Sequence, residues 1–499
     1  MKRRVVLAVC YSFFLSGCAP GRDGPTAEEN SAAVESTDKS APTGLRHDGP
    51  GAAPGYMLFT PLTTTFTYLV DPKGQVVHLW ESDLSGPGVH LLDNGNLLRS
   101  EKEPNLTVFP GTPRHGRIRE YTWDGELVWD FLLANERQIT HHDTDILPNG
   151  NVLAIVYESK SAEGSRKAGR RPSRIPEAGL WPDAILELEP KRPDGARIVW
   201  EWHAWDHLIQ NTDESLDHFG DPSAHPERIN INGDVAAPEV SPEELEQLKA
   251  LGYVPEDTKP EDLRSDLFHT NAVNYNARLD QIVMSAPRFD EIWIIDHSTT
   301  TEEAAGSSGG RWGRGGDLLY RWGNALAYDR ARNTPKQFFG GHDARFIPEE
   351  FPGGGHIMVF NNNLKDENGK DFSAVYEIAP PVDASGHYIV PKEGPFGPPQ
   401  PLWTYTAPDK VSFFSSFISS AHRLSNGNTF ICSGAQGRFF EVTPEGEIVW
   451  EYWSPYRGGA SPDLNERAPR GVFRAAKIPP DHPALARREL KPLDPQPTP

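Results

Sequence analysis

The sequence predicts an all-β fold, a six-bladed β-propeller of four-stranded antiparallel blades with a short helical insertion. Two observations predict it: an aromatic, β-prone phrase recurs along the chain, and each copy stands in the same order of strands and turns. Repeated units of this kind bury a core only by stacking on one another, and four-stranded units stacked around an axis form a propeller.

The number of copies of the aromatic phrase indicates the number of repeated units. Each copy begins with Val or Leu, contains Trp or Tyr, and reads as an outer strand; some follow a Gly turn such as Asp124-Gly125, which suits a hairpin. Six copies predict six blades, at residues 77–80, 128–131, 199–202, 319–322, 402–405 and 449–452.

The other strands of each unit follow a fixed order. An inner strand leads through an Asn-Gly type of turn, such as Asn149-Gly150 or Asn426-Gly427, to a second strand, and a third strand such as 291–296 precedes the aromatic phrase. The first unit starts at Tyr56 and lacks its inner strand. We expect residues 471–478 to supply that strand and close the ring.

The N-terminus has the features of a lipoprotein signal peptide over residues 1–17. Basic residues precede an apolar run, Val5 to Leu15, that is too short to span a membrane in the mature protein. Leu15-Ser16-Gly17-Cys18 resembles the bacterial lipobox, in which Cys18 becomes the lipidated first residue; an ordinary signal with a chance cysteine is the alternative. Because Ala19 follows, the resemblance implies a lipid-anchored protein in the periplasm or at the cell surface, at the outer membrane.

The rest of the chain divides by composition. Residues 18–54 are rich in Gly, Pro, Ser and charge and are expected to be a disordered tether. The propeller is expected over 55–480, with an insertion at about 206–265 and a C-terminal tail at 481–499. Within the insertion, Ser241-Pro242-Glu243-Glu244 combines an N-cap serine, a first-turn proline and a glutamate at the third position, which predicts a short helix.

Charge and cysteine content exclude several classes. A net charge of −21 argues against nucleic-acid binding, so any site for an anion has to be local. Cys10 would leave with the signal and Cys18 would carry lipid, so Cys432 has no cysteine partner in the mature chain. Its strand context predicts a buried, inert thiol.

Three histidines occupy one repeat position. His142, His269 and His342 each stand at the same offset near an inner strand, so we expect them to converge on the central channel. His90 and His422 stand three residues later in their own repeats, and an offset of three on a strand points to the opposite face.

Two kinds of chemistry fit three convergent imidazoles. Three imidazoles are the ligand set of a catalytic zinc site, which makes metal binding one hypothesis. The neighbours favour an anion instead: Asn271 lies two residues after His269 and would face the same side, and Arg288 suits the oxygens of a tetrahedral oxyanion.

The chain from about Tyr56 to Ile478 resembles the bacterial arylsulfate sulfotransferases (the arylsulfotransferase, or ASST, family). The resemblance implies a six-bladed propeller of the bacterial envelope that moves a sulfuryl group from an aryl sulfate donor to a phenolic acceptor, without a nucleotide sulfate donor. The sequence has no Gly-rich phosphate loop, in keeping with that donor, and we expect no cofactor. The segments that carry the resemblance are 268–273, 291–298, 342–344 and 424–429.

By motif, His342 matches the histidine that is transiently sulfated in this family. His142, His269, Asn271 and Arg288 match the groups that hold the sulfuryl oxygens, with a small shift in spacing needed for the arginine. Asp343 is expected to be structural, because neighbouring strand residues point to opposite faces.

Two other functions stay open: a non-catalytic envelope propeller that binds a ligand or protein, and a metal-dependent sulfate ester hydrolase. The sequence does not decide between a monomer and a homodimer, nor does it identify the natural donor and acceptor.

Overall fold

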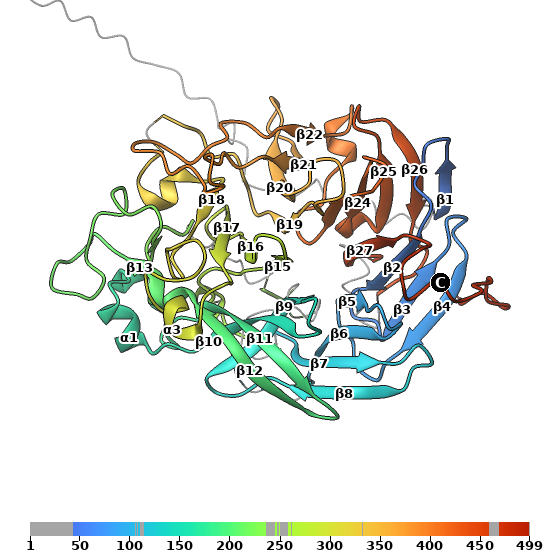
Figure 1. The fold of residues 1–499 in the computed structure, drawn as a ribbon, viewed down its shortest axis with the longest axis horizontal. Helices are drawn as coiled ribbons and strands as arrows, with labels where there is room; N and C mark the ends of the chain where they lie inside the picture. The colour runs from blue at the N-terminus through green and yellow to red at the C-terminus, as the bar shows by residue number, and fades with distance from the viewer. Residues whose placement is uncertain are drawn as a thin grey trace, which may run out of the picture. The chain divides into compact units, whose positions relative to one another are not determined.

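The structure is a computed structural model that describes residues 43–104, 106, 108–109, 114–235, 245–246, 249, 258–260, 262–331, 333–458 and 469–498. These residues form six antiparallel blades arranged in a ring around the inner strands (Figure 1), so the predicted fold class is confirmed. Among the described residues, no helix has the length and apolar character needed to cross a membrane.

The blades follow chain order, and the four strands of each run from the inner to the outer position. The first three are β27 (Val472–Ile478), β2 (Tyr56–Pro61), β3 (Phe66–Val70), β4 (Val76–Glu81); β5 (Gly88–Leu91), β6 (Leu97–Lys102), β7 (Gly116–Tyr121), β8 (Leu127–Leu132); and β9 (Gln138–Ile146), β10 (Val152–Glu158), β11 (Asp183–Lys191), β12 (Gly195–His203). The others are β15 (Ala272–Asn276), β16 (Gln281–Ala286), β17 (Glu291–Asp296), β18 (Tyr320–Trp322); β19 (His342–Phe346), β20 (Ile357–Lys365), β21 (Asp371–Ile378), β22 (Trp403–Tyr405); and β23 (Ser420–Arg423), β24 (Thr429–Ser433), β25 (Arg438–Val442), β26 (Ile448–Trp453).

The aromatic phrases are the outer strands, as predicted, and their rings fill the spaces between blades. Trp129 of β8 is fully buried and packs in one cluster with Leu98 of its own blade and Val152 and Leu186 of the next. Burial of apolar area at each such interface stabilises the ring by roughly 25 cal/mol per Å². The blades therefore depend on one another for their cores.

The ring closes through β27, which pairs antiparallel with β2 so that Tyr56 lies opposite Ile478. This confirms the prediction that residues 471–478 supply the missing inner strand. The residues that follow were expected to form a tail, but Ala484 and Leu485 are buried against the first blade, and the Gln496 side chain hydrogen-bonds the backbone of Val76.

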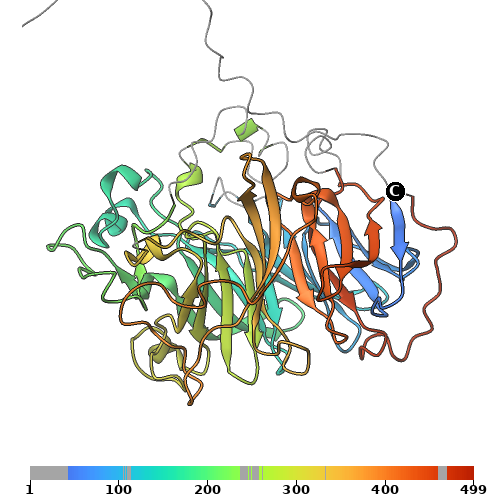
Figure 2. The ribbon, with the colours of Figure 1, turned by 90° about the horizontal axis from the view of Figure 1, so that it is seen from above.

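The folded part begins earlier than predicted. Gly44–Asp48, assigned from its composition to the disordered tether, forms β1 and pairs with β26 as a fifth strand of the last blade. Figures 1 and 2 show this blue strand beside the orange-red strands of that blade. The prediction failed because an edge strand gains its pairing from backbone groups, which composition does not reveal.

Side chains of the inner strands tie neighbouring blades together. Asp143 accepts a hydrogen bond from the Val273 amide, and Asp343 accepts one from the Ala421 amide, at 3.1 Å each. The Phe346 amide donates in the same way to Asn274. These bonds satisfy amides that face the next blade, and they hold the inner strands at a fixed spacing.

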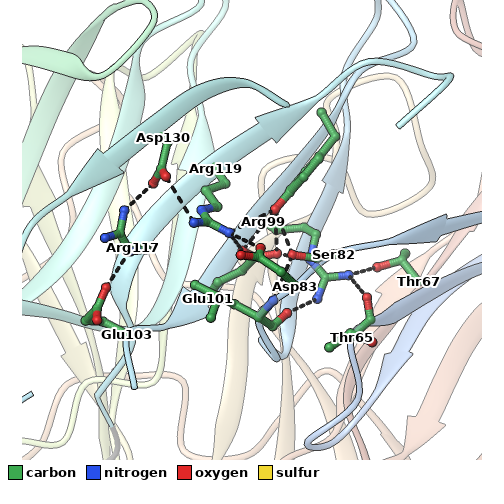
Figure 3. A network of polar contacts seen from close by, with 12 residues as sticks. Thr65, Thr67, Ser82, Asp83, Arg99, Glu101, Glu103, Arg117, Arg119 and Asp130 are labelled. Carbon is green, nitrogen blue, oxygen red and sulfur yellow. Dashed lines mark hydrogen bonds and ion pairs between the residues drawn. The ribbon is translucent and has the colours of Figure 1, made fainter. Parts of the chain in front are cut away.

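A buried polar network joins the first two blades (Figure 3). Arg99 of β6 donates to the Thr67 hydroxyl of β3 and pairs with Glu101 at 2.6 Å. Glu101 also pairs with Arg119, which reaches Asp130 on the outer strand. The network fixes β6, and with it the end of that strand at Lys102.

The insertion predicted at about 206–265 does lie between two blades, since β12 ends at His203 and β15 begins at Ala272. It contains a 3₁₀ turn (Ala204–His207) and the short parallel pair β13 (Leu208–Ile209) and β14 (Ile229–Asn230). Of the predicted helix, Leu245 and Glu246 are helical, and the other residues of Ser241–Leu248 lie outside the described residues. Short helices α1 (Ala162–Lys167) and α3 (Thr301–Ala304) lie in other loops.

Candidate active site

A pocket of about 130 Å³ lies at one end of the inner strands, and His142, His269 and His342 all line it. The predicted convergence of these three side chains is thus observed. His115 and Lys102 line the same pocket. The remaining wall is largely apolar and comes mainly from Leu62, Phe417, Ile418 and Phe473.

Unusual backbone brings the histidines together. His142 and His269 have φ of +50° and +57°, and Ile418, a β-branched residue, has φ of +52°. Non-glycine residues rarely adopt this region, and such strain gathers at functional sites. His142 also lies in a bulge of β9, where His141, His142 and Asp143 oppose Ile155 alone. A bulge changes the direction of a side chain, so strand alternation does not apply here.

Asn362 determines which nitrogen of His342 carries the proton. The Asn362 amide group donates to the carbonyls of Ser415 (2.7 Å) and Ile418 (2.9 Å), so its oxygen faces His342 Nδ1 at 2.8 Å as an acceptor. Nδ1 therefore holds the proton, and Nε2 keeps a lone pair that accepts from the Ile418 amide at 3.1 Å. Burial lowers the pKa of His342 to about 4, so the ring is neutral at neutral pH.

His142 is held between two other imidazoles. Its Nδ1 lies 2.7 Å from Nδ1 of His141, whose Nε2 is 3.4 Å from Asp183. The His142 and His269 rings meet edge to face with centroids 4.5 Å apart. Burial, together with neighbouring histidines, holds the pKa of His142 well below its usual value.

His269 forms a dyad with Asp266. Its Nδ1 donates to the Asp266 carboxylate, which is buried. Burial alone would raise the pKa of Asp266, but the His269 ring and the Arg288 guanidinium outweigh it and lower that pKa. A carboxylate in this position fixes the orientation of the His269 ring.

Arg288 and Asn271 do not line the pocket. Arg288 donates to the Leu263 carbonyl and lies 4.0 Å from Asp266, so it stands behind the dyad. Asn271 is fully buried, donates to the Gly341 carbonyl at 3.0 Å and accepts from Ser285. Asn271 does not face the same side as His269, contrary to the prediction, because His269 has a left-handed backbone and β15 begins only at Ala272.

An ionic layer closes the channel beneath the histidines. Arg474 of β27 pairs with Asp143 at 2.7 Å and with Asp343 at 2.8 Å, and Arg345 also pairs with Asp343. Each aspartate directly follows a site histidine in the sequence. The structural role predicted for Asp343 is confirmed.

His90 and His422 lie away from the pocket, as their offset predicted. His422 accepts a hydrogen bond from the Lys477 amide of β27, and His90 borders a larger opening at the other end of the inner strands. Cys432 is buried, as predicted, and burial raises the pKa of its thiol far above the usual value.

Sequence reasoning missed five residues: Lys102, His115, His141, Asp266 and Asn362. The adjacency of His141 to His142 was a usable signal, because polar pairs on a buried inner strand need partners. In the described part of the chain, no group of three His, Cys, Asp or Glu side chains has an arrangement that could hold a metal ion.

Comparison with known proteins identifies the family. The model of the arylsulfotransferase (ASST) family matches residues 53–454, which is most of the chain. The chain belongs to the arylsulfotransferase family. Membership indicates an enzyme that transfers sulfuryl groups of aryl sulfates, as the sequence resemblance implied. A search of curated proteins found no significant match.

Several solved structures match the chain at low sequence identity and low TM-score. A protein of unknown function from Bacteroides caccae is 11% identical, with a TM-score of 0.42, over 85% of this chain and 99% of that chain. A catalytically inactive virginiamycin B lyase from Staphylococcus aureus is 8% identical, with a TM-score of 0.34, over 82% and 88%. A periplasmic gluconolactonase from Pseudomonas aeruginosa is 11% identical, with a TM-score of 0.37, over 85% and 99%. These similarities carry no argument about activity.

Proposed function

We propose that this arylsulfotransferase moves a sulfuryl group from an aryl sulfate to a phenol through a covalent intermediate on His342, without a nucleotide donor. The observation that carries the proposal is the neutral ring of His342, whose Nε2 keeps its lone pair because Asn362 holds the proton on Nδ1. A nucleophile in this protonation state needs no separate base to activate it.

In the first half-reaction, Nε2 of His342 attacks the sulfur, the nitrogen–sulfur bond forms, and the bond from sulfur to the aryl oxygen breaks. In the second half-reaction a phenol oxygen attacks the same sulfur and releases His342. The Ile418 amide, which donates to Nε2 at 3.1 Å, is then free to donate to a sulfuryl oxygen bound at that nitrogen.

Two histidines support the sulfuryl oxygens in this proposal. When His141 donates through Nδ1 to His142, the Nε2–H of His142 is left to donate into the pocket. Asp266 holds the His269 ring through Nδ1, so that this ring lines the pocket as a second polar contact for the sulfuryl oxygens. Donors fixed before the reaction stabilise charge that develops in the transition state.

Asn271 and Arg288 do not contact the substrate in this proposal but support residues of the site. Asn271 holds the Gly341 carbonyl next to His342, and Arg288 helps to keep Asp266 ionised. The aryl ring of a donor or acceptor would pack on Phe417 and Phe473, which give the pocket an apolar wall.

The test is an assay of the purified protein with a chromogenic aryl sulfate, with and without a phenol acceptor, before and after treatment with a chelator. We expect release of the chromophore that depends on the acceptor, with ping-pong kinetics, and no effect of the chelator. Release to water alone, lost on chelation, would indicate a metal-dependent hydrolase. No release with a broad panel of aryl sulfates would favour a binding protein.

A further inference from the structure

We propose that Lys102 is the acid and base of the transfer reaction, giving a proton to the departing aryl oxygen and taking one from the incoming phenol. This inference rests on the proposed function and assigns a role to a residue that lines its pocket.

Lys102 and His342 come from opposite sides of the ring. The blades follow chain order, so the second blade, with β6, lies across from the fifth blade, with β19 (Figure 1). Lys102 is the last residue of β6 and His342 the first of β19, and both line the same pocket. His142 and His269 belong to the third and fourth blades, between the two.

The positions of His342 and Lys102 on opposite sides of the pocket match the geometry of displacement at sulfur. As in phosphoryl transfer, the attacking and departing atoms lie roughly in line on opposite sides of the transferred group. With Nε2 of His342 on one side, the aryl oxygen departs towards the far wall, where Lys102 lies. His142 and His269 then approach the sulfuryl oxygens from the side.

The lining of the far wall is suited to a negatively charged aryl oxygen. Among the described residues that line the pocket, Lys102 is the only Lys or Arg, and none is Asp or Glu. His115, which stands beside it, is buried, and its Nδ1 has no hydrogen-bond partner within the described part of the chain. Among these described lining residues, a developing phenolate would meet one ammonium group and no carboxylate.

Over the two half-reactions, Lys102 gives up one proton and takes one back. The Lys102 ammonium gives a proton to the departing oxygen, which leaves as a phenol. Neutral His342 becomes a sulfated imidazolium, and its Nδ1 keeps its proton and still donates it in the hydrogen bond to Asn362. The neutral amine of Lys102 then takes the proton of the acceptor phenol as its oxygen attacks sulfur. Both side chains return to their initial states, and the products are one phenol and one aryl sulfate.

The protonation behaviour of Lys102 suits both steps. Burial lowers the pKa of Lys102 to about 8, between neutral pH and the value of about 10 typical of a phenol such as tyrosine. Of the charged groups near it, Glu101 pairs with Arg99 and Arg119, and Glu103 pairs with Arg117. The other titratable groups that line the pocket with it are His115, His142, His269 and His342.

The experiment compares Lys102→Met with the wild type on two donors, phenyl sulfate and 4-nitrophenyl sulfate. A nitrophenolate leaves without help, whereas a phenolate needs a proton, so we expect kcat/KM to fall about 10²-fold or more for phenyl sulfate and about tenfold or less for the nitro compound. Lys365→Met, which removes an exposed lysine of β20 that pairs with Asp371, is the matched control and should change neither.

A pH profile provides a second readout. In the wild type, kcat/KM for phenyl sulfate should fall as the pH rises through about 8, because the ammonium form is required, and it should also fall below about 4, where His342 becomes protonated. Lys102→Met should lose the alkaline limb and keep the acid one. Lys102→Arg, which keeps the charge, should lose the alkaline limb as well.

Equal losses for the two donors, no loss for either, or an alkaline limb that persists without Lys102 would overturn the inference while leaving transfer through His342 intact. A wild-type protein that transfers no sulfuryl group would overturn the inference together with the proposed function.

Discussion

The three histidines of the pocket differ in the partner that each one has. His342 alone has an amide oxygen on Nδ1 and a lone pair on Nε2; His142 is linked to another imidazole, and His269 to a carboxylate. Identical side chains at one repeat position thus have different hydrogen-bonding surroundings. The roles proposed for them follow from these partners rather than from their shared position.

This difference predicts unequal effects of substitution. His342→Asn should reduce turnover to near background because no covalent intermediate can form. His142→Ala should leave measurable transfer, slower by about 10² to 10³-fold, because it removes one donor to the sulfuryl oxygens. Steady-state rates with an aryl sulfate and a phenol measure both. If the two variants were equally slow, the proposed nucleophile would be wrong.

At the residue scale, the repeat pattern was enough to find His142, His269 and His342, because a shared position in each blade faces the same channel. It was not enough to orient Asn271, since the left-handed backbone at His269 breaks the alternation on which that prediction relied, and it gave no orientation for Arg288. Lys102 and Asn362 carry no repeat signal. Lys102 is found only when the second and fifth blades are seen to line one pocket, and Asn362 only through its hydrogen bond to His342 within the fifth blade.

At the scale of elements, the aromatic phrases and Asn-Gly turns predicted the strands well. Gly95, Gly150 and Gly427 all have φ between +84° and +94°, as such turns require. The strand β1 could not be predicted because it pairs with β26, a distant part of the chain. The bulge of β9 could not be predicted because it is an irregularity in the register of the β9–β10 pair, which the sequence pattern does not reveal. The bulge matters most, since it directs His142 into the pocket.

The closing strand β27 allows a test of how the ring depends on its ends. Deleting the chain from Arg470 onward removes β27 and Arg474, which leaves Asp143 without its ion-pair partner and one edge of β2 unpaired. Uncompensated buried charge typically costs about 3–5 kcal/mol, and the lost strand adds to it, so we expect no cooperative thermal unfolding. Circular dichroism measures this.

The control for that experiment is a deletion of residues 497–499 alone, which keeps the contact between Gln496 and Val76 and should unfold as the full chain does. A truncation at Arg470 that remained folded and soluble would show that the ring does not need its closing strand.

At the scale of the whole molecule, we propose that the enzyme is held at the bacterial outer membrane by lipid on Cys18, which lies outside the described residues. Cys18→Ala should release the protein from membranes without altering its fold, because the acyl chains on this residue supply the anchoring. Fractionation of cells, with thermal unfolding as a control for the fold, measures this. Retention of the processed variant in the membrane fraction would contradict the proposal.

The most direct measurement of the central claim is the mass of the enzyme quenched after mixing with an aryl sulfate and no acceptor. Covalent catalysis predicts one added sulfuryl group of about 80 Da on the peptide that contains His342, removed when a phenol is added. Its absence from active enzyme, or its presence on a peptide with His142 or His269 instead, would contradict the account.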